Sequence, residues 1–597
     1  MAGETVCTMF WNKVEEISDR PALSSREGDA WNTLNWHDYG EAVKEAALGL
    51  IALGLEPKQT VGILSSNRPE WHIADVAGFT AGGTTVPVYL TNSPSQVAYI
   101  LGHSDAQFVF LENEEQLLKI EKERDELPAL EHAVIFDGAA SADGFVLTMD
   151  ELRAKGRALA EEQPDLYESR WKDVEPDDTI TIVYTSGTTG PPKGAMLSHK
   201  NVVFTVKSLY ERMPEPMNEG RRVSFLPLSH IAERDTSHFL GIYAGLHVYF
   251  AESLDTLARD LAEVKPTVLF AVPRVWEKFY AGIQAKLAAL PDEQRQMAEM
   301  AVGGAKMAVE ARQAGQEVPE ELQQRLQMAD QMLFAPVRAA LGLDEALSLV
   351  SGAAPINPDI IKFFHGIGLP IAEVYGQTED CGPTSLNPRE RIKIGTVGPP
   401  LDGVEVRIAD DGEVLVRGDN VFQGYFKNPE ATAEMLEGGW MHSGDVGELD
   451  EDGYLTITDR KKDLIITAAG KNIAPQELEN RLKYHPLISQ AVIIGDRRPF
   501  LSALVTLDPE ALAKWAADQG LGATDPAELR DSPELEAQIA GAVEAVNAEF
   551  SRAEQIKKWT VLDRDFLQEE DEITPTLKVR RRAIVEKYAD AIEAMYA

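Results

Sequence analysis

The chain of 597 residues carries 57 lysine and arginine residues against 97 aspartate and glutamate residues, a formal net charge of −40 at pH 7. Hydrophobic residues make up 44% of it and charged residues 26%, which is typical of a folded globular protein and excludes a mostly disordered one. Because nucleic-acid binding depends on a basic surface, so acidic a chain is not a general nucleic-acid binder.

The cysteine content and the apolar stretches indicate in which cellular compartment the protein is expected. Cys7 and Cys381 are the only cysteines, which favours a reducing compartment over a disulfide framework. The N-terminus has no basic segment followed by an apolar run, so we see no secretory signal. The longest apolar stretch, Phe239–Ala251, contains His247 and is too short to cross a bilayer. We therefore expect a cytoplasmic protein with no transmembrane segment; peripheral membrane contact and the oligomeric state stay open.

Short apolar runs alternate with helical patterns in the first 150 residues. We expect strands there at 61–64, 85–89, 108–111 and 133–136, with helices at 69–80 and 95–101. The same alternation of strands and helices predicts further strands at 179–184, 267–272, 347–350 and 371–375. Strands separated by helices predict α/β sheets that are mostly parallel and covered on both faces.

The remaining elements predict further units. Residues 281–341 are rich in Ala, Gln, Glu and Met and read as two or three helices, whereas 404–416 read as a hairpin of a β-rich subdomain. A charged stretch at 459–463 precedes a fresh α/β pattern with strands at 491–494 and 503–506. We therefore expect a large, multi-subdomain N-terminal domain at 1–459 and a small α/β C-terminal domain at 460–597, joined by a hinge at 459–463.

The segment 184–194 follows a predicted strand and precedes a predicted helix from Ser198. Its glycines allow close backbone approach, its hydroxyl groups donate hydrogen bonds and its lysine supplies charge, which is what polyphosphate oxygens require. The Walker pattern does not fit, because two prolines separate the last glycine before the lysine from that lysine. The expected phosphate-binding residues are Thr185, Ser186, Gly187, Thr188, Thr189, Gly190 and Lys193.

Two further strings, 351–355 and 375–379, stand at the ends of predicted strands. Ligands of open α/β sheets bind outside the carboxyl ends of strands, so both strings are well placed for a nucleotide. Tyr375 offers a ring for stacking on adenine, and Glu379 offers a hard oxygen for Mg²⁺. Gly352, Ala353, Gly376 and Thr378 complete the candidates in these strings.

Together these motifs resemble the adenylate-forming superfamily of acyl-CoA synthetases, luciferases and peptide-synthetase adenylation domains, over nearly the whole chain. The resemblance implies that the 184–194 loop clamps the β- and γ-phosphates of ATP. It also implies that Tyr375 packs on adenine, that Thr378 approaches the α-phosphate, and that Glu379 binds magnesium with Thr185 as the second contact. Thr378 and Lys193 are then expected to take part in catalysis.

The ribose and hinge motifs of the same family resemble the Ser-Gly-Asp string that ends at Asp445 and the Asp-Arg-x-Lys string at 459–462. Asp445 could accept hydrogen bonds from both ribose hydroxyls and Arg460 could donate to them, and the spacing adds Lys462. The segment at Gly470 and Lys471 is similar to the family's glycine loop beside the CoA arm.

A basic segment near the C-terminus, 573–580, matches the family's terminal lysine motif. The match makes Lys578 the expected catalytic lysine of the first half-reaction, on a mobile C-terminal domain.

The strings 67–71, 225–233 and 272–278 look like those of long-chain acyl-CoA synthetases, especially the bubblegum type. They make His230 and Trp276 candidate substrate-binding residues, and the resemblance implies that a tryptophan at 276 gates the fatty-acid tunnel. Without the resemblance, a structural histidine and a core tryptophan would be expected. No charge pattern suits the ammonium group of an amino acid.

The expected reaction converts a long-chain fatty acid, ATP and CoA into acyl-CoA, AMP and pyrophosphate through an acyl-adenylate, with Mg²⁺ as cofactor. Alternatives on the same fold are an acyl-AMP ligase and an aryl or medium-chain acyl-CoA ligase. A noncatalytic fatty-acid or nucleotide binder is the alternative from another class. Loss of Lys578, Glu379 or the phosphate loop would favour the binder, and all three are present.

Overall fold

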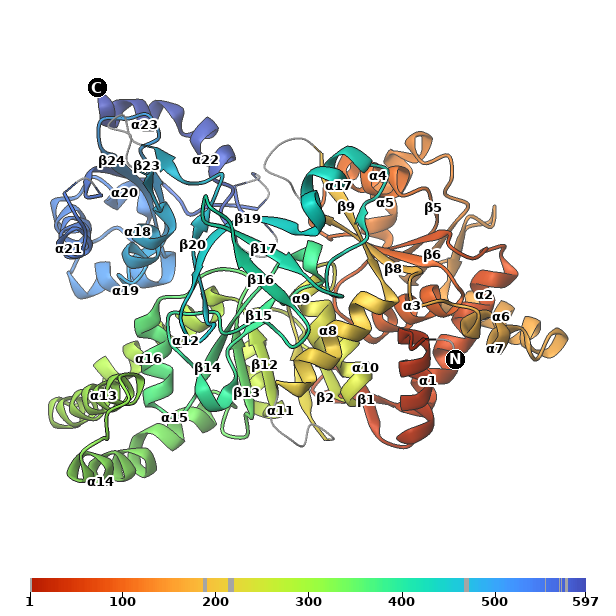
Figure 1. The fold of residues 1–597 in the computed structure, drawn as a ribbon, viewed down its shortest axis with the longest axis horizontal. Coiled ribbons are helices and arrows are strands. Elements are labelled where there is room, and N and C mark those ends of the chain that lie inside the picture. The colour runs from red at the N-terminus through yellow and green to blue at the C-terminus, as the bar shows by residue number, and fades with distance from the viewer. Residues whose placement is uncertain are drawn as a thin grey trace.

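A computed structural model describes residues 3–185, 191–212, 219–466, 472–552, 554–568, 570, 572–574 and 578–597. Figure 1 shows a large N-terminal part, coloured red to teal, beside a smaller C-terminal part in blue. The buried apolar residues form separate clusters: those of the N-terminal part end at Leu455, and those of the C-terminal part begin at Ile465. The predicted α/β class, with a β-rich subdomain and a C-terminal α/β unit, is confirmed.

The largest sheet has eight strands in the order β18-β9-β8-β4-β3-β5-β6-β7. From β8 to β7 the neighbours are parallel, whereas β9 and β18 join antiparallel. All five residues of β3 are buried, as expected of a central parallel strand covered on both faces. The strands are β3 (Thr60–Leu64), β4 (Thr84–Pro87), β5 (Ala106–Asn113), β6 (His132–Asp137), β7 (Val146–Thr148), β8 (Thr179–Thr185), β9 (Lys193–Ser198) and β18 (Gly424–Tyr425).

Helices accompany this sheet. The start of α4 has a full capping box from Ser93 and Gln96, which satisfies two backbone N–H groups of the first turn. The helices are α1 (Val6–Glu16), α2 (Trp36–Ala52), α3 (Pro69–Thr80), α4 (Pro94–His103), α5 (Glu114–Lys122), α6 (Met149–Glu162), α7 (Leu166–Lys172) and α8 (His199–Glu211), with a 3₁₀ turn η1 (Arg124–Glu126).

A second sheet has the order β10-β11-β1-β2, with β10, β11 and β1 parallel and β2 antiparallel. Its strands are β1 (Pro21–Glu27), β2 (Ala30–Asn35), β10 (Arg221–Ser224) and β11 (His247–Phe250). Between β10 and β11 the chain forms α9 (Ile231–Glu233), the π-helix η2 (Arg234–Phe239) and α10 (Leu240–Ala244).

The third sheet has the order β12-β13-β14-β15 and holds the strand ends expected to face the nucleotide. Strands β12, β13 and β14 are parallel, and β15 is antiparallel. They are β12 (Val268–Ala271), β13 (Ser348–Ser351), β14 (Ile371–Tyr375) and β15 (Ser385–Leu386).

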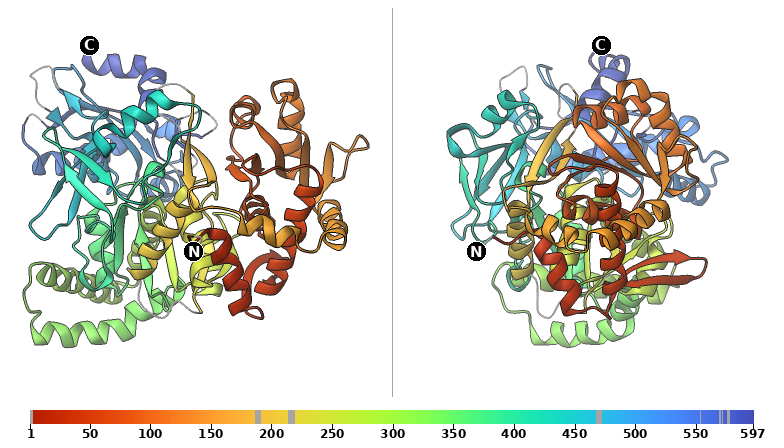
Figure 2. Two further views of the ribbon diagram at one scale, coloured as in Figure 1. Left: turned by 45° about the vertical axis from the view of Figure 1, so that its right-hand side comes forward. Right: turned by 90° about the vertical axis from the view of Figure 1, so that its right-hand side faces the viewer.

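Helices flank this sheet, and the predicted helical segment 281–341 is borne out: α13 and α14 lie at the periphery in Figures 1 and 2. These helices and turns are α11 (Leu257–Val264), α12 (Pro273–Ala288), α13 (Asp292–Gln313), α14 (Glu320–Ala329), η3 (Asp330–Phe334), α15 (Ala335–Ala340), α16 (Pro358–Gly366), η4 (Thr378–Asp380) and η5 (Arg389–Arg391).

An antiparallel sheet of four strands, β16-β17-β19-β20, forms the β-rich subdomain. The predicted hairpin is present, with Gly412 at φ +86° in its turn. The elements are β16 (Glu405–Ile408), β17 (Glu413–Arg417), β19 (Met441–Leu449) and β20 (Leu455–Arg460), with α17 (Pro429–Met435) and η6 (Glu437–Gly439) before β19.

The C-terminal part contains a sheet in the order β23-β24-β25, with β23 antiparallel and β25 parallel to β24, and a two-stranded pair β21-β22. Its strands are β21 (Ile465–Ile466), β22 (Asn472–Ile473), β23 (Ile488–Ile494), β24 (Leu501–Leu507) and β25 (Ile556–Val561). Its helices are α18 (Pro475–Leu482), α19 (Pro509–Asp518), α20 (Pro526–Leu529), α21 (Pro533–Glu549), α22 (Arg581–Lys587) and α23 (Ala589–Tyr596).

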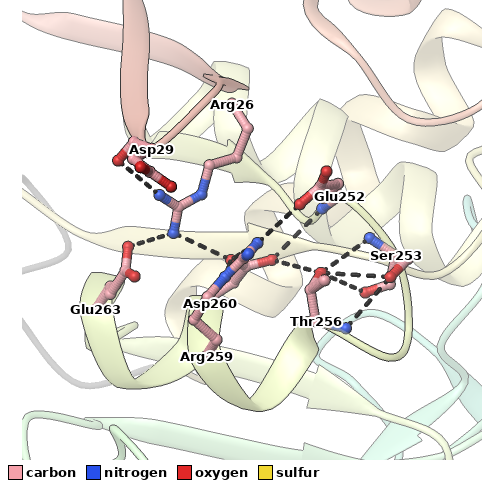
Figure 3. Close-up of polar contacts among 8 residues, drawn as sticks. All are labelled: Arg26, Asp29, Glu252, Ser253, Thr256, Arg259, Asp260 and Glu263. Carbon is pink, nitrogen blue, oxygen red and sulfur yellow. Dashed lines mark hydrogen bonds and ion pairs between the residues drawn. The ribbon is translucent and has the colours of Figure 1, made fainter.

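A polar cluster ties β1 to α11 (Figure 3). The buried carboxylate of Asp260 accepts hydrogen bonds from Arg26 at 3.3 Å, from Arg259 at 2.9 Å and from the Thr256 hydroxyl at 3.0 Å. Arg26 also pairs with Glu263. A charge buried this completely needs such partners, so the cluster joins residues more than 200 positions apart in sequence.

Candidate active site

The hairpin of β8 and β9 flanks the predicted phosphate loop. Thr185, the last residue of β8, is the register partner of Lys193, the first residue of β9. Ser186, Gly187, Thr188, Thr189 and Gly190 lie outside the described residues. The expected helix begins directly after Ser198, which caps it, but the whole strand β9 precedes it, an element that the sequence did not predict.

Two glycines at the ends of β13 and β14 lie in close backbone packing. A Cβ on Gly352 would stand 2.3 Å from Cγ1 of Val374, and one on Gly376 would stand 1.7 Å from the carbonyl oxygen of Gly382. Ala353 has φ +69°, in the left-handed region. The backbone at both strand ends is therefore tightly fixed, and no side chain larger than hydrogen fits at Gly376.

Glu379 is a buried carboxylate at the point where three segments meet. Tyr425 of β18 donates a hydrogen bond of 2.7 Å to its Oε1, and the Oγ1 of Thr185 lies 3.5 Å from the same oxygen. The Nζ of Lys193 stands 5.0 Å from the centre of the Tyr425 ring. Thr378 precedes Glu379 in η4, partly buried.

The donors at Glu379 fit a magnesium ion. Magnesium prefers hard oxygens and is bound in proteins by one or two carboxylates together with substrate phosphates. Glu379 supplies a carboxylate and Thr185 a hydroxyl at one end of the phosphate hairpin. The two residues can therefore hold the ion together, and their role as the pair of metal contacts stays a prediction.

Asp445, Arg460 and Tyr375 form a second polar group. Asp445 of β19 is the register partner of Arg460 of β20, so both lie on adjacent strands. Arg460 Nε lies 3.2 Å from Asp445 Oδ1, and the Tyr375 hydroxyl donates to Oδ2 at 2.7 Å. Burial raises the pKa of Asp445 while the charge of Arg460 opposes the rise. Burial and the Asp445 charge raise the pKa of Tyr375 well above its usual range.

Lys578, of the C-terminal part, lies close enough to Asp445 and Arg460 for their charges to act on it. Two hydrogen bonds hold its main chain: Thr574 N–H donates to the Lys578 carbonyl at 2.8 Å, and Lys578 N–H donates to the Thr574 hydroxyl at 3.0 Å. Burial, together with the charge of Arg460, lowers the pKa of Lys578 to about 8, against the opposing charges of Asp445 and Glu379. The lysine therefore lies in the electrostatic field of the predicted nucleotide site.

A buried glutamate, Glu572, anchors the chain next to Lys578. Glu572 accepts two hydrogen bonds from Arg564, at 2.6 and 2.9 Å, and one of 2.7 Å from the Tyr588 hydroxyl. These partners outweigh burial and lower the pKa of Glu572 to about 2. Because Arg580 N–H donates to the Glu572 carbonyl, the main chain two residues after Lys578 is tied to this glutamate.

The two expected acyl residues occupy different settings. His230 is the N-cap of α9, where its Nδ1 accepts from Ala232 N–H at 3.2 Å. Burial and the charge of Lys578 lower the pKa of His230 to about 3, so its ring is neutral at pH 7. Trp276 is fully buried near the start of α12, a few residues past the end of β12, with edge contacts to Phe279 and Phe364. No described residue accepts a hydrogen bond from its indole N–H.

The remaining predicted residues belong to the segment after β20. Lys462 is exposed in the turn that follows Arg460. Gly470 and Lys471 lie outside the described residues.

Sequence reasoning missed Tyr425, which bonds Glu379 and stacks under Lys193. It also missed Asp380, whose side chain accepts from Gln377 N–H at 2.7 Å and from the Thr384 hydroxyl, and thereby shapes the turn at Glu379. No local pattern marks either residue, since Tyr425 reaches the site by pairing β18 with β9 far earlier in the chain.

Among the described residues, no helix has both the length and the apolar character that a membrane crossing requires.

Comparisons with known proteins find two matching family models and similar chains along the whole sequence. A family model described as AMP-binding enzyme matches residues 10–426, and one described as AMP-binding enzyme C-terminal domain matches 462–597. The chain is 39% identical to the long-chain-fatty-acid–CoA ligase FadD15 of Mycobacterium bovis, covering 99% of this chain and 97% of that one. It is 36% identical to the long-chain-fatty-acid–CoA ligase ACSBG2 of Xenopus laevis, covering 99% and 84%.

A solved structure shares the fold. The A-PCP didomain of a carboxylic acid reductase from Segniliparus rugosus, in complex with AMP, matches with a TM-score of 0.76 at 21% identity. The match covers all of this chain and 82% of that one.

Proposed function

The chain belongs to the AMP-binding enzyme family, and from this premise we propose that it converts long-chain fatty acids to acyl-CoA through an acyl-adenylate. In the first half-reaction a carboxylate oxygen of the fatty acid attacks the α-phosphorus of ATP, and the bond to pyrophosphate breaks. In the second, the sulfur of CoA attacks the acyl carbon, AMP leaves, and the thiol proton passes to solvent. The first step replaces a poor leaving group with a good one.

The observation that carries this proposal is the position of Lys578. A lysine of the C-terminal part lies within the electrostatic field of Asp445 and Glu379, which belong to the N-terminal part, and of Arg460 at the domain boundary. Joining a carboxylate to a phosphate brings two anions together, so a positioned cation lowers the barrier. Lys578 supplies that cation despite the net charge of −40.

Each remaining residue has a role in the proposed site. Tyr375 and the backbone at Gly352, Ala353 and Gly376 flank the adenine, and Asp445 with Arg460 binds the ribose hydroxyls. Lys193 neutralises phosphate charge, and Thr378 donates toward the α-phosphate. The phosphate-loop residues from Thr185 to Gly190 hold the β- and γ-phosphates. Magnesium, when bound by Glu379 and Thr185, supplies further positive charge at the phosphates.

The second half-reaction needs the space that Lys578 occupies. We propose that the C-terminal domain, 460–597, turns on the hinge at 459–463 and brings the loop at Gly470 and Lys471 to the site, beside the pantetheine arm of CoA. Exchange of rigid bodies about a few hinge residues is an established way to switch between two states. Lys462, at the hinge, contacts the nucleotide in one of these states.

The acyl chain is proposed to enter beside His230 and Trp276. A neutral His230 adds no charge to an apolar chain, and Trp276 contacts other aromatic side chains around it. We place the enzyme in the cytoplasm, where its two free, buried cysteines stay reduced.

The proposal is tested with purified protein and carboxylic acids of graded chain length. Long-chain acids should give pyrophosphate with ATP alone, and AMP release should then depend on CoA. Adenylate formation without CoA-dependent AMP release would instead identify an acyl-AMP ligase, and a preference for aryl or medium-chain acids would replace the long-chain assignment. No turnover of any acid would leave a noncatalytic binder.

The role of Lys578 is tested by measuring the half-reactions separately. Lys578→Ala should slow acyl-adenylate formation by roughly 10²-fold or more, the scale for losing one preorganised charge-stabilising donor. Preformed acyl-adenylate and CoA should still give thioester at close to the normal rate. Equal losses in both half-reactions, with the fold intact, would contradict the two-state mechanism.

A further inference from the structure

Helix α12 of the N-terminal part is bonded directly to the C-terminal part. Arg274, in its first turn, lies 2.9 Å from Oδ2 of Asp508 and donates to the Ser489 hydroxyl at 3.1 Å. Asp508 caps α19, and Ser489 lies in β23. The side chains of Arg274 and Asp508 are each about one-fifth exposed, at 21% and 22%, so the pair is largely shielded from solvent.

A second contact lies nearly two helical turns further along α12. Tyr280 stacks on Tyr484, with ring centres 6.1 Å apart and an interplanar angle of 27°, and the two hydroxyls are 3.2 Å apart. Tyr280 also meets the edge of Phe363 at 4.9 Å. Figure 1 shows the C-terminal part beside α12 and α16, where these contacts lie.

Neither contact belongs to the nucleotide site. Arg274 and Tyr280 stand on the helix that carries Trp276, whereas Lys578 lies in the electrostatic field of Asp445 and Arg460. The C-terminal part is therefore held at two separated places in the orientation that presents Lys578.

We propose that Arg274 and Tyr280 are positioning residues that hold the C-terminal domain in the adenylating orientation, through Asp508 and Tyr484. The inference rests on the proposed two-step function and adds to it the residues that select one domain orientation. A rigid-body turn about 459–463 moves Asp508 and Tyr484 away from α12, so both contacts exist in one orientation only. An interaction that exists in only one of two conformations shifts the equilibrium toward that conformation by the whole of its free energy.

The contacts therefore favour adenylation and oppose thioester formation. Arg274→Ala should raise the ratio of the thioester-forming rate constant to the adenylate-forming rate constant by about fivefold, the scale of one well-formed, partly exposed ion pair. Tyr484→Ala should shift the ratio in the same direction, and because Tyr484 is 42% exposed, its loss leaves the core intact.

Control variants separate orientation from general stability. Arg338 has similar exposure and pairs with Asp330 inside the N-terminal part, so Arg338→Ala should leave the ratio unchanged. Asp508→Asn keeps an oxygen for the α19 cap and loses the charge, and it should therefore reproduce the Arg274→Ala shift. Arg274→Lys keeps the charge, so its ratio of rate constants should lie between those of Arg274→Ala and the wild-type protein.

The domain orientation can also be observed directly. Both native cysteines are buried, so spin labels on cysteines introduced at the exposed residues Glu317 and Lys514 report one distance between the two parts. Arg274→Ala should reduce the population at the distance seen in the wild-type protein with ATP bound.

An unchanged ratio in both Arg274→Ala and Tyr484→Ala, with an unchanged distance distribution, would overturn this inference. Failure of the proposed function is distinguishable, because the wild-type protein would then form no acyl-adenylate or would release no AMP in response to CoA.

Discussion

Lys578 illustrates how single residues acquire chemistry from their surroundings. On an exposed tail it would be an ordinary, fully charged lysine. Burial beside Arg460 lowers its pKa to about 8, so the protonated fraction of Lys578 changes with pH close to the physiological range. Bound phosphates, being anionic, favour the protonated form and raise the pKa again.

The pKa of Lys578 predicts the pH dependence of adenylation. A lysine with a lowered pKa is protonated below that value and neutral above it. The kcat/KM for ATP should therefore fall as the pH rises through about 8, whereas kcat should hold to higher pH because bound ATP keeps the proton in place. Initial rates of pyrophosphate release at pH 6.5 to about 9.5 measure both profiles.

Lys578→Arg provides the control, since a guanidinium stays protonated throughout this range. Its residual adenylation should be flat through pH 8. The same fall in Lys578→Arg would assign the titration to another group.

Glu379 is the second residue whose role depends on its neighbours. Glu379→Gln keeps the size and loses the charge, so adenylate formation should drop by roughly 10²-fold or more while the fold survives. Tyr425→Phe removes only the hydrogen bond of 2.7 Å to Glu379 and should cause a smaller loss. Adenylation at limiting Mg²⁺ measures both, and near-wild-type activity of Glu379→Gln would exclude the metal role.

At the scale of elements, strand pairing places the chemistry. The β8–β9 hairpin brings Thr185 and Lys193 together, and pairing of β9 with β18 adds Tyr425. The β19–β20 pair aligns Asp445 with Arg460. Backbone hydrogen bonds thus fix five side chains that span about half of the chain.

The cluster at Asp260 is an element-scale test of stability. Asp260→Asn should lower stability by about 2–4 kcal/mol, because Arg26 would keep a buried charge without its nearest buried partner. Glu263→Gln, at a carboxylate 44% exposed, should cost less than about 1 kcal/mol. Thermal unfolding of both variants measures the difference. Equal shifts in Tm would show that the buried pair stabilises the fold no more than the exposed one.

Helix α12 offers an element-scale test of substrate choice. Trp276→Ala should change the chain-length profile and leave the KM for ATP largely unaltered, because Trp276 lies in the aromatic cluster and not among the nucleotide residues. Trp36→Ala removes a buried tryptophan of a different apolar cluster and should leave the profile intact. The same profile in Trp276→Ala and wild type, over short to long acids, would remove Trp276 from the specificity argument.

At the scale of the whole molecule, two separately packed parts meet at one site. Their cores do not merge across 455–465, which suits a boundary that can act as a hinge. The turn after β20 is defined by the Arg460 carbonyl, which accepts from Asp463 N–H at 2.9 Å and from Leu464 N–H at 3.1 Å.

Lys462→Pro tests that hinge. From the charged sequence 459–463 alone, a proline at 462 is expected to stiffen the hinge, trap the adenylating orientation and slow thioester formation. In the structure Lys462 is the third residue of the 460–463 turn, without positive φ, where proline forces the residue before it out of the turn. Lys462→Pro should therefore slow adenylation more than thioester formation, with Lys462→Ala as the control. Selective loss of thioester formation would show that the turn opens during catalysis and must not be stiffened.

Local sequence patterns were enough to predict the α/β class, most strands of the parallel sheets, and the motifs of a nucleotide site. Helix α3 begins and ends at the predicted residues, because Pro69 sets its start and its signals are local. Family resemblance then supplied the reaction.

Only the tertiary structure decided which distant segments meet. Strand β1 pairs with β11, β18 pairs with β9, and Lys578 comes to Asp445 through packing that no local pattern encodes. The lowered pKa of Lys578, the contact of Tyr425 with Glu379, and the Arg274–Asp508 pair follow from that packing. The physical reason is that periodicity and capping act over a few residues, whereas burial and charge pairing depend on the folded chain as a whole.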